Sequence, residues 1–593
     1  MPTSRASVSS ETESSSRPLV IVMGLAAIAV PALLAFRRMP STTFFNQAAA
    51  LIGWAAFLLT LARSTGWPRI GARTGLAALM VALSIGGAAA LVSIVWVPLP
   101  TSLALLSFGM IAAAALTALV GAAAAHAGRA DEAFHAVCVA LVAAGVLSVV
   151  VSLIQVFAPG LADGEWIAPP PAEGRAGGNL RQPNHLSTLL LWSMVAATWL
   201  TETGRLARVW SALLMSAFVF GLVLASSRTG VVGVLVLSLW GLLDRGLSPQ
   251  TRATLVIAPI AYLLCFGGLT LWSHTTHQVF GGEIRINEAA DSPNSRWRIW
   301  MNALSLIAQN PWWGVGFGEF NFAWTLTTFP QRPTAFFDHA HNLPLQFAVE
   351  LGVPLAALLL ALIAWALWRA FVAGRDAAIP HAGMLRAAFL IVLVIAVHSL
   401  LEYPLWYAHF LLPTAFVFGL CLKDDFRVPD PVSPTESRPG SRVRPLLLAC
   451  TLMLGGGVLS VIDYMRVVRV YMPDDDLPPL PLRIAIGQRS WFFAHHAAYA
   501  AATIHPHPSQ VMPSFRVATH FVLDSRLLIA WAVALDETGD VERARYLAQR
   551  AREFRNEYSN EFFRPCNDPA PRTVPLPFQC TPPSRQFNYR DFR

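Results

Sequence analysis

The segment Asp338-His339-Ala340-His341-Asn342 places two imidazoles, a carboxylate and a carboxamide within five consecutive positions of this 593-residue chain. It ends a long polar stretch and leads into an apolar run that begins at Leu343. Histidine is the side chain best suited to accept or donate a proton near neutral pH. The segment therefore predicts proton-transfer chemistry by His341 or His339. The alternative is an ordinary polar helix start in which Asp338 caps the helix.

Arginines are the second group of side chains that could do chemistry. Arg228 lies in the short turn Ser226–Gly230 between two apolar stretches, where a charge is costly unless it extends to the membrane surface or meets an anion. A guanidinium group stays charged and binds two phosphate oxygens at once, which suits a diphosphate. Other polar side chains suited to such a ligand are Arg181, Gln182, Asn184, His185, Arg296 and Arg298. The last two belong to a segment expected to lie along the membrane interface.

The chain is too hydrophobic for a soluble globular protein. Hydrophobic residues make up 55% of it, charged residues 13%, and its mean hydropathy is +0.50. Apolar runs long enough to cross a bilayer as helices recur about 13 times. The predicted spans are 18–36, 43–62, 74–97, 102–126, 133–158, 185–201, 208–225, 229–243, 253–272, 343–370, 385–401, 406–422 and 445–463. The predicted fold class is therefore an all-α, polytopic integral membrane protein.

Polar stretches between the spans divide the chain into five parts. The expected parts are a disordered tail (1–17), a first bundle of transmembrane helices (18–272), an outward loop with the histidine segment (273–342), further transmembrane helices (343–465) and a soluble helical domain (466–593). Within the last part, residues 527–534 and 541–554 resemble one tetratricopeptide-type helix pair. A single pair is equally well explained as an ordinary helical hairpin that closes the domain.

Arginine in the short loops predicts the orientation in the membrane. The net charge of +8 is almost entirely arginine, because Lys423 is the only lysine. Pairs such as Arg205 with Arg208 fall on one side, which is then cytoplasmic, whereas Arg37 and Arg38 fall on the other. The long loop, the turn at Arg228 and the C-terminal domain are accordingly expected together on the opposite, outward side.

Cysteine usage offers a separate indication of compartment. Cys566 and Cys580 are the two cysteines in polar sequence, and a disulfide between them would close a loop of about 15 residues. Such a bridge would persist in an oxidising compartment such as a periplasm, whereas two free thiols are the alternative.

Two functional classes fit the pattern poorly. A proton-driven transporter usually needs acidic side chains in the middle of the membrane, and here Glu402 and His398 alone come close, near the end of one span. No basic patch interleaved with aromatic residues occurs in a soluble domain, so nucleic acid is not an expected partner. The concentration of polar chemistry on one membrane face favours catalysis at the outer surface.

Several of these segments together resemble the O-antigen ligase/polymerase superfamily. The resemblance rests on the Ser226–Gly230 turn, the long outward loop, and His341-Asn342-Leu343 with ten residues between His341 and Gly352. Further stretches are similar to the protein O-oligosaccharyltransferase branch of that superfamily. They are Gly178-Asn179, Gln182-Pro183-Asn184-His185, Leu401-Glu402-Tyr403-Pro404 and the soluble tail.

The resemblance implies a GT-C-like membrane glycosyltransferase with a periplasmic active site. Such an enzyme transfers an oligosaccharide en bloc from undecaprenyl diphosphate to an acceptor hydroxyl, with inversion at the anomeric carbon. His341 would accept the hydroxyl proton, and Arg228 would stabilise the departing diphosphate. Substrate contacts would come from Arg181, Gln182, Asn184, His185, Arg296, Arg298, His339 and Asn342. No cofactor and no metal are expected, since no Asp-x-Asp pair stands beside the histidines.

The acceptor is the least determined part of this prediction. The branch-like motifs favour a serine or threonine of a protein, which is protein glycosylation. The alternatives are lipid A–core, as in lipopolysaccharide biosynthesis, a growing glycan, as in an O-antigen polymerase, and a polysaccharide transporter. Membrane lipids are expected partners in every case.

Overall fold

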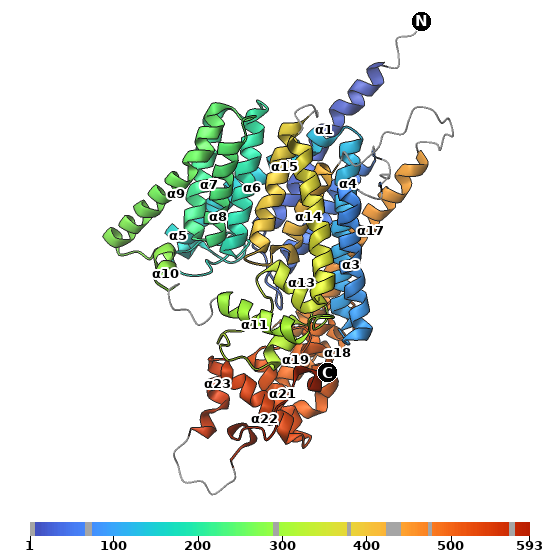
Figure 1. Cartoon of the computed structure of the whole chain (residues 1–593), viewed down its shortest axis with the longest axis vertical. Helices are drawn as coiled ribbons and strands as arrows, with labels where there is room; N and C mark the ends of the chain where they lie inside the picture. The colour runs from blue at the N-terminus through green and yellow to red at the C-terminus, as the bar shows by residue number, and fades with distance from the viewer. Residues whose placement is uncertain are drawn as a thin grey trace. The chain divides into compact units, whose positions relative to one another are not determined.

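A computed structural model describes residues 6–63, 65, 71, 74–288, 296–375, 381–422, 440–472, 477–567 and 576–593, without the side chains of 6–17, 286–288 and 440–443. Within these ranges every regular element is a helix, apart from two isolated β-bridges. The helices are drawn and labelled in Figure 1. The predicted all-α class is confirmed.

Each predicted span coincides with helical structure. Among the described residues nine helices are long and apolar enough to cross a membrane: α2 (Phe44–Ala62), α3 (Gly75–Trp96), α4 (Thr101–His126), α5 (Ala130–Phe157), α7 (Arg208–Ala225), α9 (Pro249–Thr276), α14 (Val353–Arg375), α15 (Ala382–Ser399) and α17 (Gly440–Tyr471). The other predicted spans are the helices α1 (Ala6–Leu33), α6 (Pro183–Glu202), α8 (Arg228–Leu243) and α16 (Ala408–Cys421). The chain is an integral membrane protein, and the number of 13 crossings stays a prediction.

Two helix boundaries differ from the sequence prediction. Helix α1 begins at Ala6, inside the tail that we expected to be disordered up to residue 17. Residues 6–17 contain no glycine or proline, so a helix nucleated in the apolar part extends through them. The predicted span 343–370 is two helices, α13 (Leu343–Leu351) and α14, which are separated by Gly352 at φ +79°. A Cβ atom at Gly352 would collide with the Trp312 carbonyl, so this break requires glycine.

The chain consists of two compact units. The first unit comprises Met1–Leu83, Ala112–Ala290 and Leu362–Leu459, and the second comprises Ser84–Ile111, Asp291–Ala361 and Ser460–Arg593. Helices α3, α4, α14 and α17 each contribute one part to each unit. The division of the sequence into a tail, two sets of transmembrane helices, a loop and a soluble domain stays a prediction.

The first unit is a bundle of apolar helices packed through small residues. In Figure 1 α6, α7 and α8 run side by side. Helices α4 and α16 approach closely, because a Cβ atom at Gly121 would meet the backbone of Phe416 and one at Gly419 would meet that of Ala118. Small residues at such positions allow backbone contact between membrane helices. This packing fixes the C-terminal half of α16 against α4.

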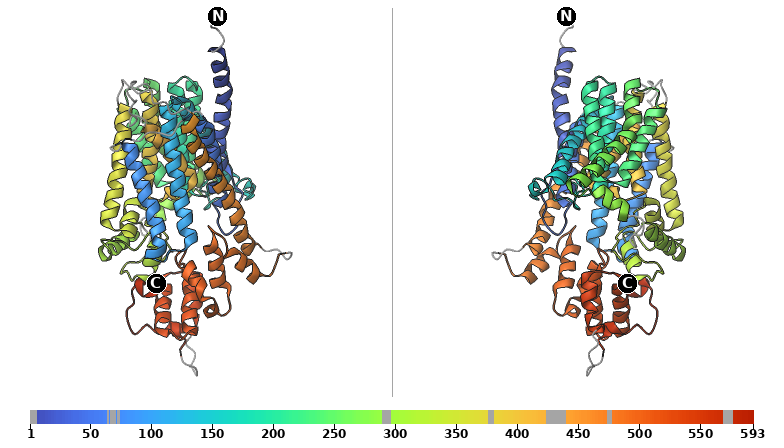
Figure 2. Two further views of the ribbon diagram at one scale, coloured as in Figure 1. Left: turned by 90° about the vertical axis from the view of Figure 1, so that its right-hand side faces the viewer. Right: turned by 90° about the vertical axis from the view of Figure 1, so that its left-hand side faces the viewer.

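The second unit joins the loop before α14 to the C-terminal helices. Its loop elements are α11 (Arg296–Gln309), α12 (Phe320–Leu326) and α13, and its C-terminal elements are α18 (Leu480–Gly487), α19 (Ala494–Ile504), α20 (Met512–Ala518), α21 (Ser525–Glu537), α22 (Val541–Glu553) and α23 (Glu557–Phe562). Figure 2 shows the C-terminal helices gathered in one cluster. Both sets contribute to one apolar core that includes Trp324, Leu306, Leu527 and Tyr546.

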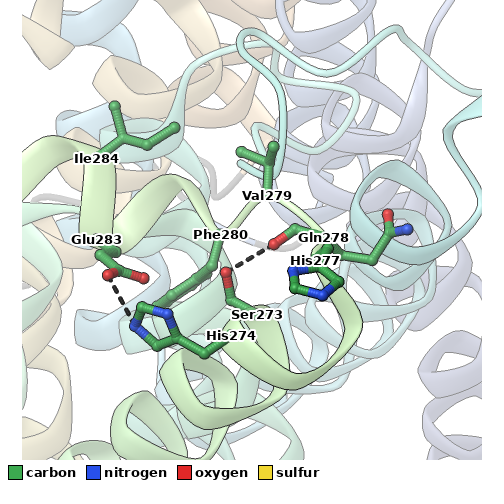
Figure 3. Close-up of a pocket in the computed structure, with 8 residues that line it drawn as sticks. All are labelled: Ser273, His274, His277, Gln278, Val279, Phe280, Glu283 and Ile284. Carbon is green, nitrogen blue, oxygen red and sulfur yellow. Dashed lines mark hydrogen bonds and ion pairs between the residues drawn. The ribbon is translucent and has the colours of Figure 1, made fainter.

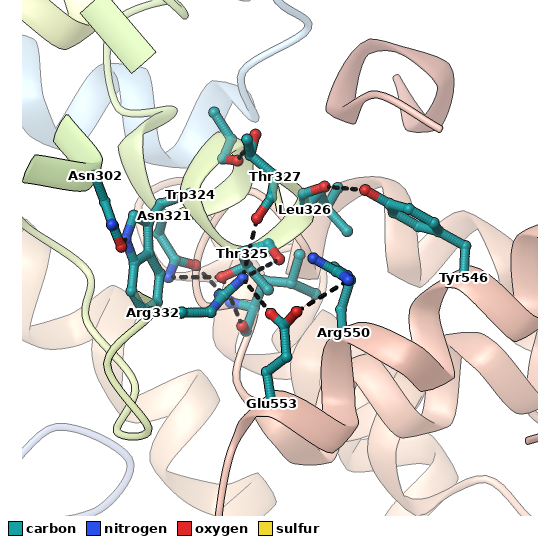
Figure 4. Close-up of polar contacts among 12 residues, drawn as sticks. Asn302, Asn321, Trp324, Thr325, Leu326, Thr327, Arg332, Tyr546, Arg550 and Glu553 are labelled. Carbon is teal, nitrogen blue, oxygen red and sulfur yellow. Dashed lines mark hydrogen bonds and ion pairs between the residues drawn. The ribbon is translucent and has the colours of Figure 1, made fainter. Parts of the chain in front are cut away.

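A buried arginine ties the loop to α22 (Figure 4). Arg332 donates to the carbonyl oxygen of Thr325 at 3.0 Å and to the Glu553 carboxylate at 3.2 Å. Its guanidinium carbon lies 4.2 Å from the centre of the Trp324 ring, and burial lowers the pKa of Arg332 to about 10. Arg550 completes the network with an ion pair of 3.0 Å to Glu553. The loop that carries the histidines is thus a folded part of the second unit.

Cys566 and Cys580 form a disulfide, which is the first of the two alternatives that the sequence left open. The two cysteines are 14 positions apart, and closing a loop of that size stabilises a fold by about 3 kcal/mol in the chain-entropy model. We expect Cys566→Ser with Cys580→Ser to lower the free energy of unfolding by about that amount. Thermal unfolding of the full chain in detergent measures this change, with Cys265→Ala as the control. Equal unfolding temperatures for the double variant and the wild type would contradict it.

Candidate active site

Three segments that are distant in the sequence meet in the first unit. Asn184 Nδ2 donates to Glu402 Oε1 at 3.0 Å, across 218 positions of sequence. The Ser227 hydroxyl donates to Asn184 Oδ1 at 2.6 Å. All three side chains are buried. A hydrogen-bonded chain therefore connects the start of α6, the turn before α8 and the segment after α15.

The turn between α7 and α8 exposes the Arg228 side chain. Ser226 ends α7 in the left-handed conformation (φ +50°), and the Ser227 hydroxyl caps α8 by accepting from the Gly230 amide at 3.2 Å. Arg228 is exposed, although its neighbours Ser227 and Thr229 are buried. Within the described residues Arg228 forms no hydrogen bond or ion pair. The turn thus carries a positively charged side chain that has no ion-pair partner among the described residues, on a backbone that hydrogen bonds hold in place.

A second arginine supports this turn and was missed by the sequence analysis. Arg175 Nε donates to the carbonyl oxygen of Ala225 at 3.0 Å, and an Nη2 contact to that of Ser226 is 3.5 Å. Burial, together with the charge of Arg285 nearby, lowers the pKa of Arg175 to about 10, so this side chain is still a cation at neutral pH. Its position in a polar loop was visible in the sequence, but its contact with the end of α7 was not.

The other predicted residues of this unit have structural contacts. The Gln182 side chain caps α6 by accepting from the His185 amide at 2.9 Å. His185 is buried, with its ring centre 4.6 Å from that of Tyr407. Arg181 donates to the carbonyl oxygen of Thr42 at 2.9 Å and to that of Ala35. Substrate binding by Arg181, Gln182 and His185 stays a prediction.

In the second unit the histidine segment is held at both ends. His341 has a left-handed backbone (φ +53°), and the Asn342 side chain caps α13 by accepting from the Leu345 amide at 3.0 Å. The Ala340 amide donates to Gln346 Oε1 at 2.8 Å, and Trp300 Nε1 donates to the Ala340 carbonyl at 3.1 Å. These bonds fix the backbone on which the His341 imidazole is carried.

The alternative in which Asp338 caps the helix is wrong. Asn342 is the cap, since it is the residue directly before α13 and its side-chain oxygen can reach the third amide of the helix. The Asp338 carboxylate instead lies 3.0 Å from His339 Nδ1 as an ion pair. The choice of His341 over His339 as the base rests on the spacing of His341 from Gly352 and stays a prediction.

Arg296 and Arg298 lie in the first turn of α11, the helix formed by the segment that was expected at the membrane interface. Both are half-buried, and the exposed Trp297 lies between them. Their part in diphosphate binding stays a prediction. No cluster of three or more metal-ligating side chains occurs in the part of the chain that the structure describes.

Glu350 is a further residue that the sequence analysis left out of the site. It is buried, accepts from Gln346 Nε2 at 2.9 Å and accepts hydrogen bonds from the Gly318 and Phe320 amides. Because Gln346 also holds the Ala340 amide, Glu350 supports the histidine segment through one intermediate. Burial raises the pKa of Glu350 to about 7.

The raised pKa of Glu350 predicts a pH-dependent stability. Between the ordinary glutamate value near 4.5 and about 7, the folded state keeps a proton that the unfolded state has released, so stability falls as pH rises. Glu350→Gln cannot ionise, and we expect it to be more stable than the wild type at pH 8 by up to about 3 kcal/mol. Thermal unfolding at pH 5 and pH 8 measures this, with the exposed Glu557→Gln as the control. The expectation would be contradicted if the unfolding temperature of Glu350→Gln changed between pH 5 and pH 8 by as much as that of the wild type.

An open groove lies at the end of α9 (Figure 3). It has a volume of about 530 Å³ and is lined by Ser273, His274, His277, Gln278, Val279, Phe280, Glu283 and Ile284. His274 pairs with Glu283 at 3.1 Å across it. The groove contains none of the predicted site residues, so we assign it no part in catalysis.

The fold and these two groups of residues define a class: an integral membrane protein with an exposed arginine turn and a rigid histidine segment. Comparisons with known proteins agree with this class. A family model described as O-antigen ligase matches residues 210–360, which include Arg228 and His341. A model described as protein glycosylation ligase matches 176–200, and one described as virulence factor membrane-bound polymerase, C-terminal, matches 386–562.

Two curated proteins of Acinetobacter baylyi are similar to this chain. A general O-oligosaccharyltransferase is 26% identical over 283 residues, which is 46% of this chain and 48% of that protein. A ComP-specific O-oligosaccharyltransferase is 26% identical over 253 residues, 42% of this chain and 44% of that protein. The chain thus spans less than half the length of the curated relatives it matches. These matches confirm the predicted resemblance to the O-antigen ligase superfamily and its O-oligosaccharyltransferase branch, whose members are glycosyltransferase-type enzymes.

Proposed function

We propose that this protein transfers an oligosaccharide en bloc from undecaprenyl diphosphate to a serine or threonine hydroxyl of a protein, at the periplasmic face of the inner membrane. The observation that carries the proposal is Arg228, an exposed and unpaired cation on a turn that the buried residues Ser227 and Asn184 hold in place. The names of both curated relatives support the reaction class.

The proposed chemistry is a single displacement. The acceptor oxygen forms a bond to the anomeric carbon as the bond from that carbon to the diphosphate oxygen breaks, which inverts the anomeric centre. The hydroxyl proton passes to His341, and the leaving diphosphate takes the bonding electron pair. Arg228, with Arg175 behind it, stabilises the negative charge that develops there. The sugar is already attached to a good leaving group, so the reaction needs no nucleotide.

The Thr229 hydroxyl adds a second argument for an anion at this turn. Thr229 is buried, and its hydroxyl has no hydrogen-bond partner among the described residues. A buried polar group without a partner is rare in folded proteins. A diphosphate oxygen beside Arg228 would supply the missing partner.

An O-antigen ligase that uses lipid A–core is the second candidate, because the O-antigen ligase model covers both Arg228 and His341. A competition experiment separates the two functions. Purified protein in detergent with EDTA is given a defined undecaprenyl-diphosphate oligosaccharide, a periplasmic acceptor protein and lipid A–core. Glycan on the protein supports our proposal, glycan on lipid A–core supports the ligase, and glycan on neither acceptor contradicts both.

The hydrogen-bonded chain of the first unit predicts a rescue experiment. Asn184→Asp places two carboxylates against each other and should cost about 3–5 kcal/mol of stability, the range for an uncompensated buried charge. Asn184→Asp combined with Glu402→Gln exchanges the amide and the carboxylate, and should regain most of the stability and transfer rate. Thermal unfolding and initial rates of the wild type and these two variants measure this. A double variant as impaired as Asn184→Asp would mean that the contact does not support the site.

A further inference from the structure

Helix α11 carries apolar side chains on two opposite faces. Ile299, Ala303 and Leu306 point into the core of the second unit. Trp297, Met301 and Leu304 are spaced by four and three positions, so they share one stripe. They are 66%, 46% and 47% exposed. A helix with one face in water carries polar residues on that face, whereas this outer stripe requires an apolar cover.

The exposed apolar surface continues beyond α11. Trp312 and Trp313, which follow the helix, are 70% and 75% exposed. The rings of Trp313 and Trp96 pack with their centres 6.2 Å apart. Trp96 is the last residue of α3, a helix that meets the criteria for a membrane span and that exposes Val92 and Val95. The surface of α11, Trp312, Trp313 and Trp96 thus adjoins side chains that lipid must cover.

Backbone hydrogen bonds attach the Trp312–Trp313 turn to the start of a second span. The Val353 amide, in the first residue of α14, donates to the carbonyl oxygen of Pro311 at 2.8 Å. The Val315 amide donates to the carbonyl oxygen of Val349 at 2.8 Å. Gly352 allows this approach, because any side chain there would collide with the Trp312 carbonyl. The tryptophan pair is therefore fixed at the point where α14 begins.

The same helix also holds the histidine segment. Trp300, one position before Met301, donates its indole N–H to the Ala340 carbonyl at 3.1 Å. Ala340 is the residue directly before His341. A displacement of α11 along the membrane normal would therefore carry the His341 backbone with it.

We propose that the outer stripe of α11, together with Trp312, Trp313 and Trp96, is a membrane-binding surface that sets the depth of the His341 segment. Its occupant is the boundary between phospholipid headgroups and acyl chains. Tryptophan is enriched at this boundary, and interfacial helices place apolar residues in it with arginines beside them, as Arg296 and Arg298 are here. A protein partner is less suited to this surface, because the surface continues directly onto the lipid-facing ends of two spans.

Depth-dependent quenching tests the membrane contact in the full chain. Cys138, Cys265, Cys421 and Cys450 are replaced by alanine, and a fluorophore is attached at Met301→Cys or, as control, at the exposed Tyr558→Cys. The protein is placed in phosphatidylcholine nanodiscs that carry nitroxide-labelled lipids. We expect several-fold stronger quenching at position 301 than at 558, with nitroxides near the headgroup most effective. Equal quenching at the two positions would overturn the proposal.

The expected effect of this surface on the KM for the lipid-linked donor rests on the proposed function, and a second experiment measures it. Trp297→Gln with Met301→Gln and Leu304→Gln should raise the KM for the lipid-linked donor several-fold in nanodiscs, with kcat and thermal stability near wild-type values. The matched control is Trp491→Gln with Ile504→Gln, which changes two exposed apolar residues, one between α18 and α19 and one at the end of α19. An unchanged KM, or an equal rise in the control, would contradict the depth-setting role. A wild type without any transfer activity would refute the proposed function, while the quenching result would still decide the membrane contact.

Discussion

Replacing His341 by alanine is expected to lower the rate of oligosaccharide transfer by about 10²–10⁴-fold, the usual contribution of a positioned acid or base. The acceptor hydroxyl must lose its proton as it attacks, and an imidazole is the group of this segment best suited to accept it near neutral pH. His339 is engaged by Asp338, and Asn342 caps α13. Initial rates with saturating donor and acceptor measure the effect, and donor binding should stay within a few-fold of the wild type.

A second variant is needed because of the backbone conformation of His341. Its left-handed conformation disfavours alanine, so a loss of activity in His341→Ala could also arise from local strain. Asparagine accepts this conformation more readily and has no basic nitrogen. We therefore expect His341→Asn to unfold at the wild-type temperature and to be as inactive as His341→Ala. Wild-type turnover in His341→Asn would eliminate this residue as the base.

Arg228→Ala is the second substitution with a large expected effect. Loss of one well-placed group that stabilises developing charge typically costs about 10²–10³ in kcat. Arg228 is exposed, and its side chain forms no hydrogen bond or ion pair with the described residues, so its removal should leave the thermal stability unchanged. This combination distinguishes a functional arginine from one that holds the turn together.

Two comparisons make the Arg228 prediction specific. Arg228→Lys keeps the charge without the planar fork that binds two oxygens, and should recover part of the rate. Arg245→Ala removes another exposed arginine, one that lies in a loop predicted to be cytoplasmic, and should leave transfer unaltered. Equal losses in Arg228→Ala and Arg245→Ala would indicate a general effect of charge rather than a diphosphate site.

Hydropathy predicted the helices well, because an apolar run of sufficient length has no alternative to a helix in lipid. The break at Gly352 was not predicted, since it depends on the backbone of Trp312, 40 positions earlier in a different element. The early start of α1 was missed for another reason: polar residues without glycine or proline can extend an existing helix.

Candidate site residues could be proposed from the sequence where the residue type itself carries the information. Arg228 and His341 stand out by their chemistry and by the motifs around them. Arg175 and Glu350 were missed, because their importance comes from contacts with the Ala225 carbonyl and with Gln346. The bond between Asn184 and Glu402 also could not be predicted, although both residues lie in stretches that had drawn attention.

The most direct test of the proposed transfer is its stoichiometry. A donor labelled in both the glycan and the diphosphate is incubated with purified protein and acceptor protein, and both products are quantified over time. We predict one intact oligosaccharide on an acceptor serine or threonine for each undecaprenyl diphosphate released, with both signals lost together in His341→Asn and in Arg228→Ala. Release of undecaprenyl diphosphate without glycan on the acceptor, or glycan that accumulates on lipid-linked donor instead, would contradict the account.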